Sequence, residues 1–217
     1  MKKPSKAKKP CRIRITERDL EILNFINDFG FCEMPQLERR FGLKKPKSYM
    51  LINRLIKVGL VKHERLFYGR HGLYRLTKKG AQHTELPPLA KVVLGNYRHD
   101  IRLIEVYLKL RTLYPEARWI SERKLKREKY CDGVGKRGHL PDGMLIFPDG
   151  KEVAIEVELT AKDKNRVERI LKWYAGKLDI KEVWYYCLPS IVVYMQKKAA
   201  RMPFVKVVGL DELIDMT

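Results

Sequence analysis

The segment 143–159 constrains the fold of this chain more than any other part of the sequence. Within 151–159, apolar side chains alternate with mostly charged ones, the period-two pattern of a β-strand that is buried on one face. An apolar run at 143–147 precedes it, and the intervening Pro148-Asp149-Gly150 is typical of a tight turn. We therefore predict two neighbouring strands. The side chains predicted on the buried face of the second are Val153, Ile155, Val157 and Leu159.

The opposite face of the second strand holds Glu156 and Glu158, which this geometry brings close together. Two carboxylates so placed repel each other unless they face water, one is protonated, or a cation lies between them. Asp142 comes just before the first strand, and Lys162 just after the second. Because Mg²⁺ binds a few carboxylate oxygens together with water and phosphate, the three acids are candidate ligands for Mg²⁺ or Mn²⁺.

Each acid also has an ordinary structural interpretation. Pro141-Asp142-Gly143 is itself a good turn sequence, so Asp142 is compatible with a simple turn. Glu156 and Glu158 would suit the outer, solvated face of an antiparallel sheet. His99, Asp100 and His139 are expected to be structural or to touch phosphate rather than to bind a metal.

The charge of the chain narrows the class of partner. A net charge of +20 and a pI near 9.8 favour polyanions, nucleic acid above all, through the release of condensed counterions. No run approaches the roughly 18 apolar residues of a membrane span, and no apolar segment follows the basic start, so neither a membrane segment nor a secretory signal is predicted. The four scattered cysteines indicate free thiols in a reducing compartment. We expect a cytoplasmic protein.

The first half of the chain has the pattern of a small helical domain. Residues 1–90 hold 21 Lys and Arg against 8 Asp and Glu, and residues 1–15 form a basic, proline-containing arm that we expect to be flexible. The helices that we predict after it run from Thr16 to Gly30, over about 35–41, and from Pro46 to Gly59. A two-stranded hairpin over 60–77 follows, with its turn at 69–72.

Three helices followed by a hairpin resemble a winged helix-turn-helix domain, here over 16–86. In that family the third helix enters the major groove and the wing touches backbone or minor groove. The resemblance implies that double-stranded DNA is contacted by Lys45, Lys47, Ser48, Tyr49, Asn53 and Arg54 around the third helix, and by Arg70 and His71 in the wing. Such units also serve as protein interaction modules, and the charges would then form only a solvated face.

Pro87-Pro88 marks the predicted boundary before a second, α/β domain over 91–217. Besides the two strands at 143–147 and 151–159, its pattern predicts a series of further elements. In chain order these are a helix at about 91–113, a strand at 117–122, a basic glycine-rich loop at 123–139, a helix at 163–177, a strand at 182–188, a helical segment near 190–201 and a strand at 204–208.

This αβββαβ order, with acids on the second and third strands, resembles the PD-(D/E)XK nuclease superfamily, which has a restriction-endonuclease-like fold. Pro141-Asp142-Gly143 matches the first motif and Glu156 the second acid, whereas Glu158 stands where the family commonly has lysine. The resemblance implies a catalytic set of Asp142, Glu156, Glu158 and Lys162, with one or two Mg²⁺ or Mn²⁺ ions that neutralise charge developing on a phosphodiester. Arg166, one turn into the next helix, is a candidate phosphate contact.

The two halves together resemble the plasmid replication-relaxation family and the related MobC-class relaxases of mobilisable elements. The resemblance implies binding to an origin of transfer or replication, alongside other relaxosome proteins in plasmid mobilisation and conjugation, with metal-dependent nicking of one strand. The nucleophile is left open between water and a tyrosine, with Tyr97, Tyr107, Tyr130 and Tyr174 available. The alternative function is a non-catalytic DNA-binding regulator or relaxosome accessory factor with a degenerate nuclease fold.

Overall fold

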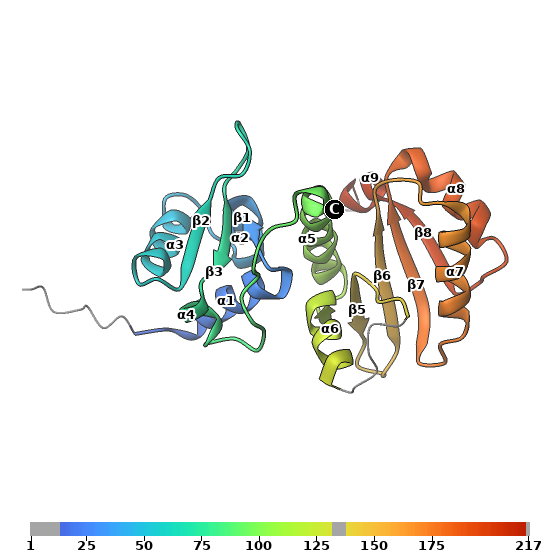
Figure 1. Cartoon of the computed structure of the whole chain (residues 1–217), viewed down its shortest axis with the longest axis horizontal. Helices are drawn as coiled ribbons and strands as arrows, with labels where there is room; N and C mark the ends of the chain where they lie inside the picture. Colours follow the sequence, from blue (N-terminus) through green and yellow to red (C-terminus); the bar gives the residue numbers. More distant parts are fainter. Residues whose placement is uncertain (1–13, 132–137, 216–217) are drawn as a thin grey trace, which may run out of the picture.

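The chain is a mixed α/β protein with two separate sheets (Figure 1). The computed structural model describes residues 14–131 and 138–215, so the predicted arm at 1–15 falls almost entirely outside them. One sheet has three strands in the order β1-β3-β2, and the other has five in the order β4-β5-β6-β7-β8. Within the described ranges, no helix combines the length and the apolar character needed to cross a membrane.

The first sheet belongs to a unit of helices and a hairpin, and the three helices and the hairpin expected from the sequence are confirmed. Its strands are antiparallel, with β3 in the middle. The short strand β1 and helix α4 were not predicted. The elements are α1 (Glu17–Phe29), β1 (Cys32–Glu33), α2 (Met34–Phe41), α3 (Lys47–Lys57), β2 (Val61–Glu64), β3 (Leu73–Leu76) and α4 (Lys78–Ala81).

The start and end of α1 follow from its sequence. The Thr16 hydroxyl accepts the backbone N–H of Asp19, and the Asp19 carboxylate accepts the backbone N–H of Thr16, so two otherwise unpaired donors of the first turn are satisfied. Gly30 ends the helix with a φ of 83°, a conformation that glycine adopts without steric cost. Between these ends, Ile22, Leu23 and Ile26 are fully buried in the core of this unit.

The second sheet is mixed and belongs to an α/β unit. Strands β4, β5 and β6 are antiparallel neighbours, whereas β6, β7 and β8 run parallel and are joined through helices. The elements are the 3-10 turn η1 (Leu94–Asn96), α5 (Tyr97–Leu113), β4 (Arg118–Ser121), α6 (Glu122–Cys131), β5 (Gly143–Ile146), β6 (Glu152–Glu158), α7 (Lys164–Ala175), β7 (Ile180–Cys187), α8 (Pro189–Ala199), β8 (Val205–Gly209) and α9 (Leu210–Asp215).

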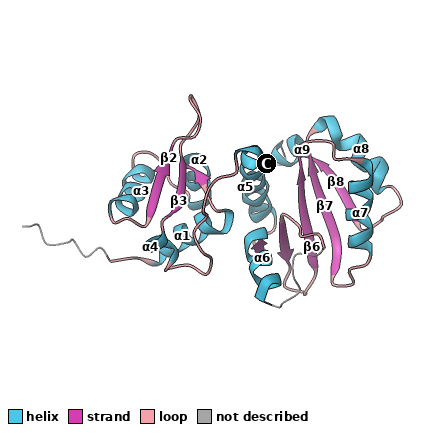
Figure 2. Cartoon of the chain, viewed as in Figure 1, coloured by secondary structure: helices cyan, strands magenta, loops and turns pink. Residues whose placement is uncertain are grey.

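Helices cover both faces of this sheet, α5 and α9 on one side and α7 and α8 on the other (Figure 2). On β6, Val153, Ile155 and Val157 face α5 and α9 and lie in one core with them, as the alternation predicts. The opposite face of β6 is also buried, because Ala154 lies in the core beneath α7. The expectation of one buried and one solvated face is therefore wrong for the centre of the sheet.

Two predicted elements differ from the structure. The loop expected over 123–139 begins instead as helix α6, and residues 132–137 lie outside the described part of the chain. Helix α6 has few apolar residues and none that is buried, so it shows no amphipathic periodicity from which it could have been predicted. The helix expected from about 91 starts only at Tyr97, after the turn η1.

Helix α5 contacts both units. Its Ile104 and Tyr107 pack into the core of the first unit, while Leu103, Val106 and Leu110 pack against the five-stranded sheet. Polar contacts join the units as well. Glu105 of α5 pairs with Arg39 of α2 and accepts a hydrogen bond from Gln36 at 3.0 Å, and Arg123 of α6 donates to Asn27 Oδ1 at 2.9 Å.

Candidate active site

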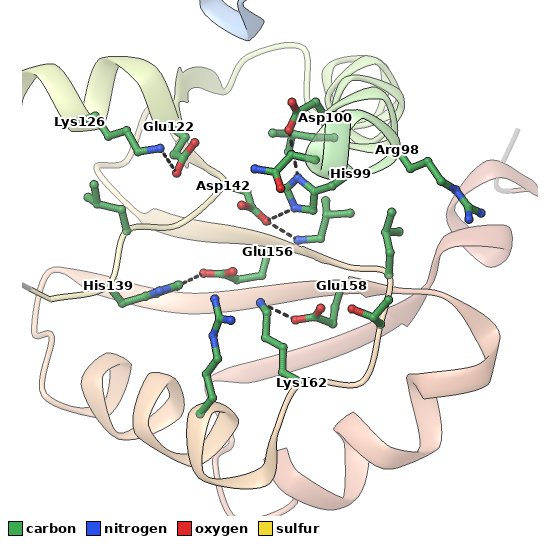
Figure 3. A pocket seen from close by; sticks show the side chains of 18 of the residues that line it. Arg98, His99, Asp100, Glu122, Lys126, His139, Asp142, Glu156, Glu158 and Lys162 are labelled. Atoms are coloured by element: carbon green, nitrogen blue, oxygen red, sulfur yellow. Dashed lines mark hydrogen bonds and ion pairs between the residues drawn. The ribbon is translucent and has the colours of Figure 1, made fainter. Parts of the chain in front are cut away.

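A cavity of about 760 Å³ lies over the five-stranded sheet where β6 ends (Figure 3). Its walls come from the start of α5, one face of α6, the residue before β5 and the start of α7. All four residues of the predicted catalytic set line it, and Arg166 joins them. The members of that set are Asp142, Glu156, Glu158 and Lys162.

Glu156 and Glu158 form the buried floor of the cavity. They are 2% and 5% exposed, so the interpretation of a water-facing pair is wrong. Lys162 Nζ lies 2.5 Å from Glu158 Oε2. Glu156 Oε1 lies 2.5 Å from His139 Nε2 and accepts a hydrogen bond from the Tyr174 hydroxyl. Burial raises the pKa of Glu156, and the contacts with His139 and Tyr174 offset part of that rise.

Asp142 is held by the backbone of the neighbouring strand. The last pair of the β5–β6 ladder is Gly143 with Ile155, and beyond it Val157 N donates to Asp142 Oδ2 at 2.8 Å. Gly143 is required next to it, because a Cβ there would lie 2.2 Å from the Trp119 ring. Pro141-Asp142-Gly143 is thus the entry to a strand, whereas Gly150 of the second such tripeptide has a φ of 82° and belongs to a true turn.

His99 carries a positive charge into the same cavity. Its Nε2 lies 3.1 Å from Asp142 Oδ2 and its Nδ1 lies 3.4 Å from Asp100 Oδ1. Burial lowers the pKa of His99, but the hydrogen bonds and charges of the two aspartates outweigh it and raise the pKa to about 10. His99 is therefore protonated at neutral pH. Its contact with Asp142 could not be predicted from the sequence, because the two residues lie far apart in the chain.

The three acids are of the type that binds a hard cation, but among the described residues they do not form a compact three-ligand cluster. In the contacts above, Asp142 uses Oδ2, Glu156 uses Oε1 and Glu158 uses Oε2, and the second oxygen of each carboxylate takes part in none of them. Mg²⁺ needs only one or two carboxylates beside water and phosphate. Within residues 14–131 and 138–215, no three Asp, Glu, His or Cys side chains already form a cluster of metal-binding size.

Exposed cations stand at the rim of the cavity, above the acids. Arg98 at the start of α5, Lys126 on α6 and Arg166 on the first turn of α7 line the cavity and are all exposed. Figure 3 shows Lys126 directed toward Glu122 on the same helix, and the two form an ion pair of 2.5 Å. The cavity thus combines buried carboxylates with exposed positive side chains, an arrangement that can hold a phosphate close to the acids.

The four tyrosines considered as nucleophiles differ in burial and in their contacts. Tyr97, Tyr107 and Tyr174 are buried, and their hydroxyls contact Glu33, Arg40 and Glu156 respectively. Tyr130, near the end of α6, is 58% exposed and is the one member of the four that lines the cavity.

Most residues predicted to contact DNA lie on the surface of the first unit. Lys45, Lys47 and Asn53 are exposed. Tyr49 is 37% exposed, and Lys45 Nζ lies 5.7 Å from its ring centroid. Arg70 and His71 are exposed in the loop between β2 and β3, which projects from the unit (Figure 1).

Two of the predicted DNA contacts also have partners within the protein, one of them buried and the other, Arg54, with a side chain that is 36% exposed. Ser48 is 1% exposed, and its hydroxyl donates to Glu38 Oε1 at 2.6 Å, so it does not face a DNA surface. Arg54 donates to Asp19, which is 1% exposed, and thereby joins α3 to α1. The sequence could not distinguish these roles, because both partners lie on other helices.

Comparison of the chain with protein family models, with curated proteins and with solved structures gave no match.

Proposed function

We propose that this chain is a DNA-binding protein that recognises an origin site on a mobile element through its first unit, a winged helix-turn-helix. Its second unit, a nuclease-like domain, nicks DNA in a metal-dependent manner. The observation that carries the proposal is the cavity, where three carboxylates lie below a rim of exposed cations. The net charge of +20 supports a polyanionic substrate.

The residues of the cavity have distinct parts in this function. Asp142, Glu156 and Glu158 would hold Mg²⁺ or Mn²⁺, which supplies charge neutralisation at the scissile phosphate. Arg98, Lys126 and Arg166 bind phosphates of the strand and orient it over the acids. Lys162 and His99 hold Glu158 and Asp142 in place and limit the repulsion between buried acids.

Nicking of supercoiled plasmid tests the proposal. The plasmid carries the DNA that flanks the gene encoding this protein, and the protein is added with Mg²⁺ or Mn²⁺. Wild type converts the plasmid to open circles, and Glu156→Gln lowers the rate by about 100-fold or more, because the variant keeps the shape of the side chain but loses the carboxylate. Glu152→Gln is the matched control, since Glu152 lies on the same strand outside the cavity, and it nicks like wild type.

A second candidate is a non-catalytic DNA-binding regulator or accessory factor. It is favoured by one observation, that each acid of the cavity already contacts a protein cation or proton donor, namely His99, His139 or Lys162. In that case the plasmid stays supercoiled with either metal, and wild type and Glu156→Gln bind the DNA equally in a gel shift.

A further inference from the structure

Helix α6 presents one continuous face to the cavity. Glu122, Lys126, Lys129 and Tyr130 all line it, at the i, i+4, i+7, i+8 spacing that places side chains on one side of a helix. Arg127 and Glu128 are exposed and do not line it. The cavity face therefore ends in an aromatic ring next to cations.

The other side of α6 is fixed to the protein. Arg123 donates to Asn27 Oδ1 at 2.9 Å and to the Pro87 carbonyl at 2.7 Å. Lys124 Nζ lies 3.4 Å from Asp28 Oδ1, and Leu125 packs against the core between the sheet and helices α7 and α8. These contacts hold the helix in one orientation, so the face that carries Tyr130 is positioned before any ligand arrives.

Among the residues that the structure describes, Tyr130 belongs to none of the hydrophobic core clusters. It is 58% exposed, on a helix without a buried residue, and it stands at the edge of a cavity whose rim carries Lys126 and Arg166. An exposed ring beside phosphate-binding cations matches the chemistry of an unpaired nucleotide, whose base stacks on the ring while its phosphate meets the cations.

The size of the cavity favours the same class of ligand. Ligand pockets of roughly 300–1,000 Å³ hold drug-sized molecules, and this cavity of about 760 Å³ is therefore large enough for a nucleotide. In a duplex both faces of each base are covered by neighbouring bases, so a protein ring can stack only on a base that is unpaired or turned out.

We propose that α6 forms a subsite for single-stranded DNA, in which Tyr130 stacks on an unpaired base and Lys126 binds the adjoining phosphate. This inference rests on the proposed function, since it names the form of DNA that enters the cavity. It assigns Tyr130 a positioning role through its ring and requires nothing of its hydroxyl.

A binding experiment without metal tests the subsite separately from cleavage. The full chain is titrated, in the presence of EDTA, into a single-stranded oligonucleotide that contains 2-aminopurine, whose fluorescence is quenched on stacking, and into its duplex. Tyr130→Ala weakens binding to the single strand by about 5- to 150-fold and abolishes the quenching, while Tyr130→Phe keeps both within roughly twofold. Binding to the duplex is unchanged in both variants.

A second pair of variants tests the phosphate contact. Lys126→Ala lowers the salt dependence of single-strand binding by about 0.7 in the slope of log affinity against log salt, and Arg127→Ala, its neighbour off the cavity face, does not. Quenching and affinity like wild type in Tyr130→Ala would overturn the inference, as would equal losses for single strand and duplex. Loss of affinity in Tyr130→Phe would overturn it too, because it would assign the effect to the hydroxyl. Absence of nicking would not bear on it.

Discussion

At the scale of single residues, Glu182 of β7 is a carboxylate that forms ion pairs with lysines near both neighbouring strands of the five-stranded sheet. Its Oε1 accepts from Lys151 Nζ at 2.6 Å, and its Oε2 accepts from Lys206 Nζ at 2.7 Å and from Trp184 Nε1 at 2.6 Å. Burial raises the pKa of Glu182, but the three donors outweigh it and lower the pKa to about 2. The ionised form is thus favoured by the fold.

This shift predicts a stability that depends on pH. The folded pKa lies below the ordinary value of 4.5, so the contribution of Glu182 is fully present above pH 4.5 and is lost as the pH falls toward 2. Glu182→Gln lowers the free energy of unfolding by about 1 kcal/mol at pH 7, a modest value because solvent screens the partly exposed lysines. Urea unfolding over a pH series measures it. A difference from wild type that stays constant below pH 4.5 would contradict the assignment, and exposed Glu116→Gln provides the control.

Single residues also show what the sequence could and could not predict about the site. Asp142, Glu156, Glu158 and Lys162 were predictable, because strand periodicity and short spacing place them near one edge. His99 and His139 were not predictable as partners of those acids, because only tertiary packing brings them within hydrogen-bonding distance. The burial of the two glutamates was missed for a related reason, since alternation alone does not reveal a helix packed over the second face.

At the scale of elements, the ion pair between Arg54 of α3 and Asp19 of α1 predicts a loss of stability on mutation. Asp19 is 1% exposed and also accepts from the Thr16 hydroxyl at 2.9 Å. Arg54→Ala leaves this buried carboxylate without its cation and lowers the free energy of unfolding by about 1–3 kcal/mol. Asp19→Asn in the Arg54→Ala background restores part of the loss, because it removes the uncompensated charge. Chemical denaturation of the four proteins gives the coupling energy.

Lys47→Ala is the matched control for that experiment. Lys47 is exposed on the same helix, so its removal changes the free energy of unfolding by no more than about 0.5 kcal/mol. We expect it to weaken DNA binding instead. If Arg54→Ala proved as stable as Lys47→Ala, the ion pair with Asp19 would not contribute to stability.

Elements with strong periodicity were predictable, and those without it were not. The strands at β5, β6 and β7 and the buried stripe of α7 follow the apolar pattern of the sequence. Helix α6 was not predictable, because seven of the ten residues in its sequence ERKLKREKYC are charged and no apolar stripe marks a helix. Its position is set by contacts of Arg123 and Lys124 with the other unit, which no local pattern encodes.

At the scale of the whole molecule, α5 makes the two units interdependent. The sequence places a boundary at Pro87-Pro88, yet Ile104 of α5 is fully buried in the core of the first unit, and Tyr107 packs beside it. Separation at the boundary would expose both side chains, and burying an aliphatic or aromatic side chain stabilises by about 1.5–3 kcal/mol. We therefore expect the full chain to unfold in one transition by calorimetry, and the fragment 91–217 to self-associate on size-exclusion chromatography.

The substitution Ile104→Ser should then affect a different property in each of the two proteins. In the full chain, Ile104→Ser lowers the free energy of unfolding by about 2–5 kcal/mol, because it opens a cavity in a packed core. In the fragment 91–217, the same change reduces self-association, because the side chain faces solvent. Leu103→Ser is the control, since Leu103 packs against the five-stranded sheet in either case and its loss destabilises both. A monomeric fragment that Ile104→Ser destabilises as much as the full chain would show that α5 belongs to the second unit alone.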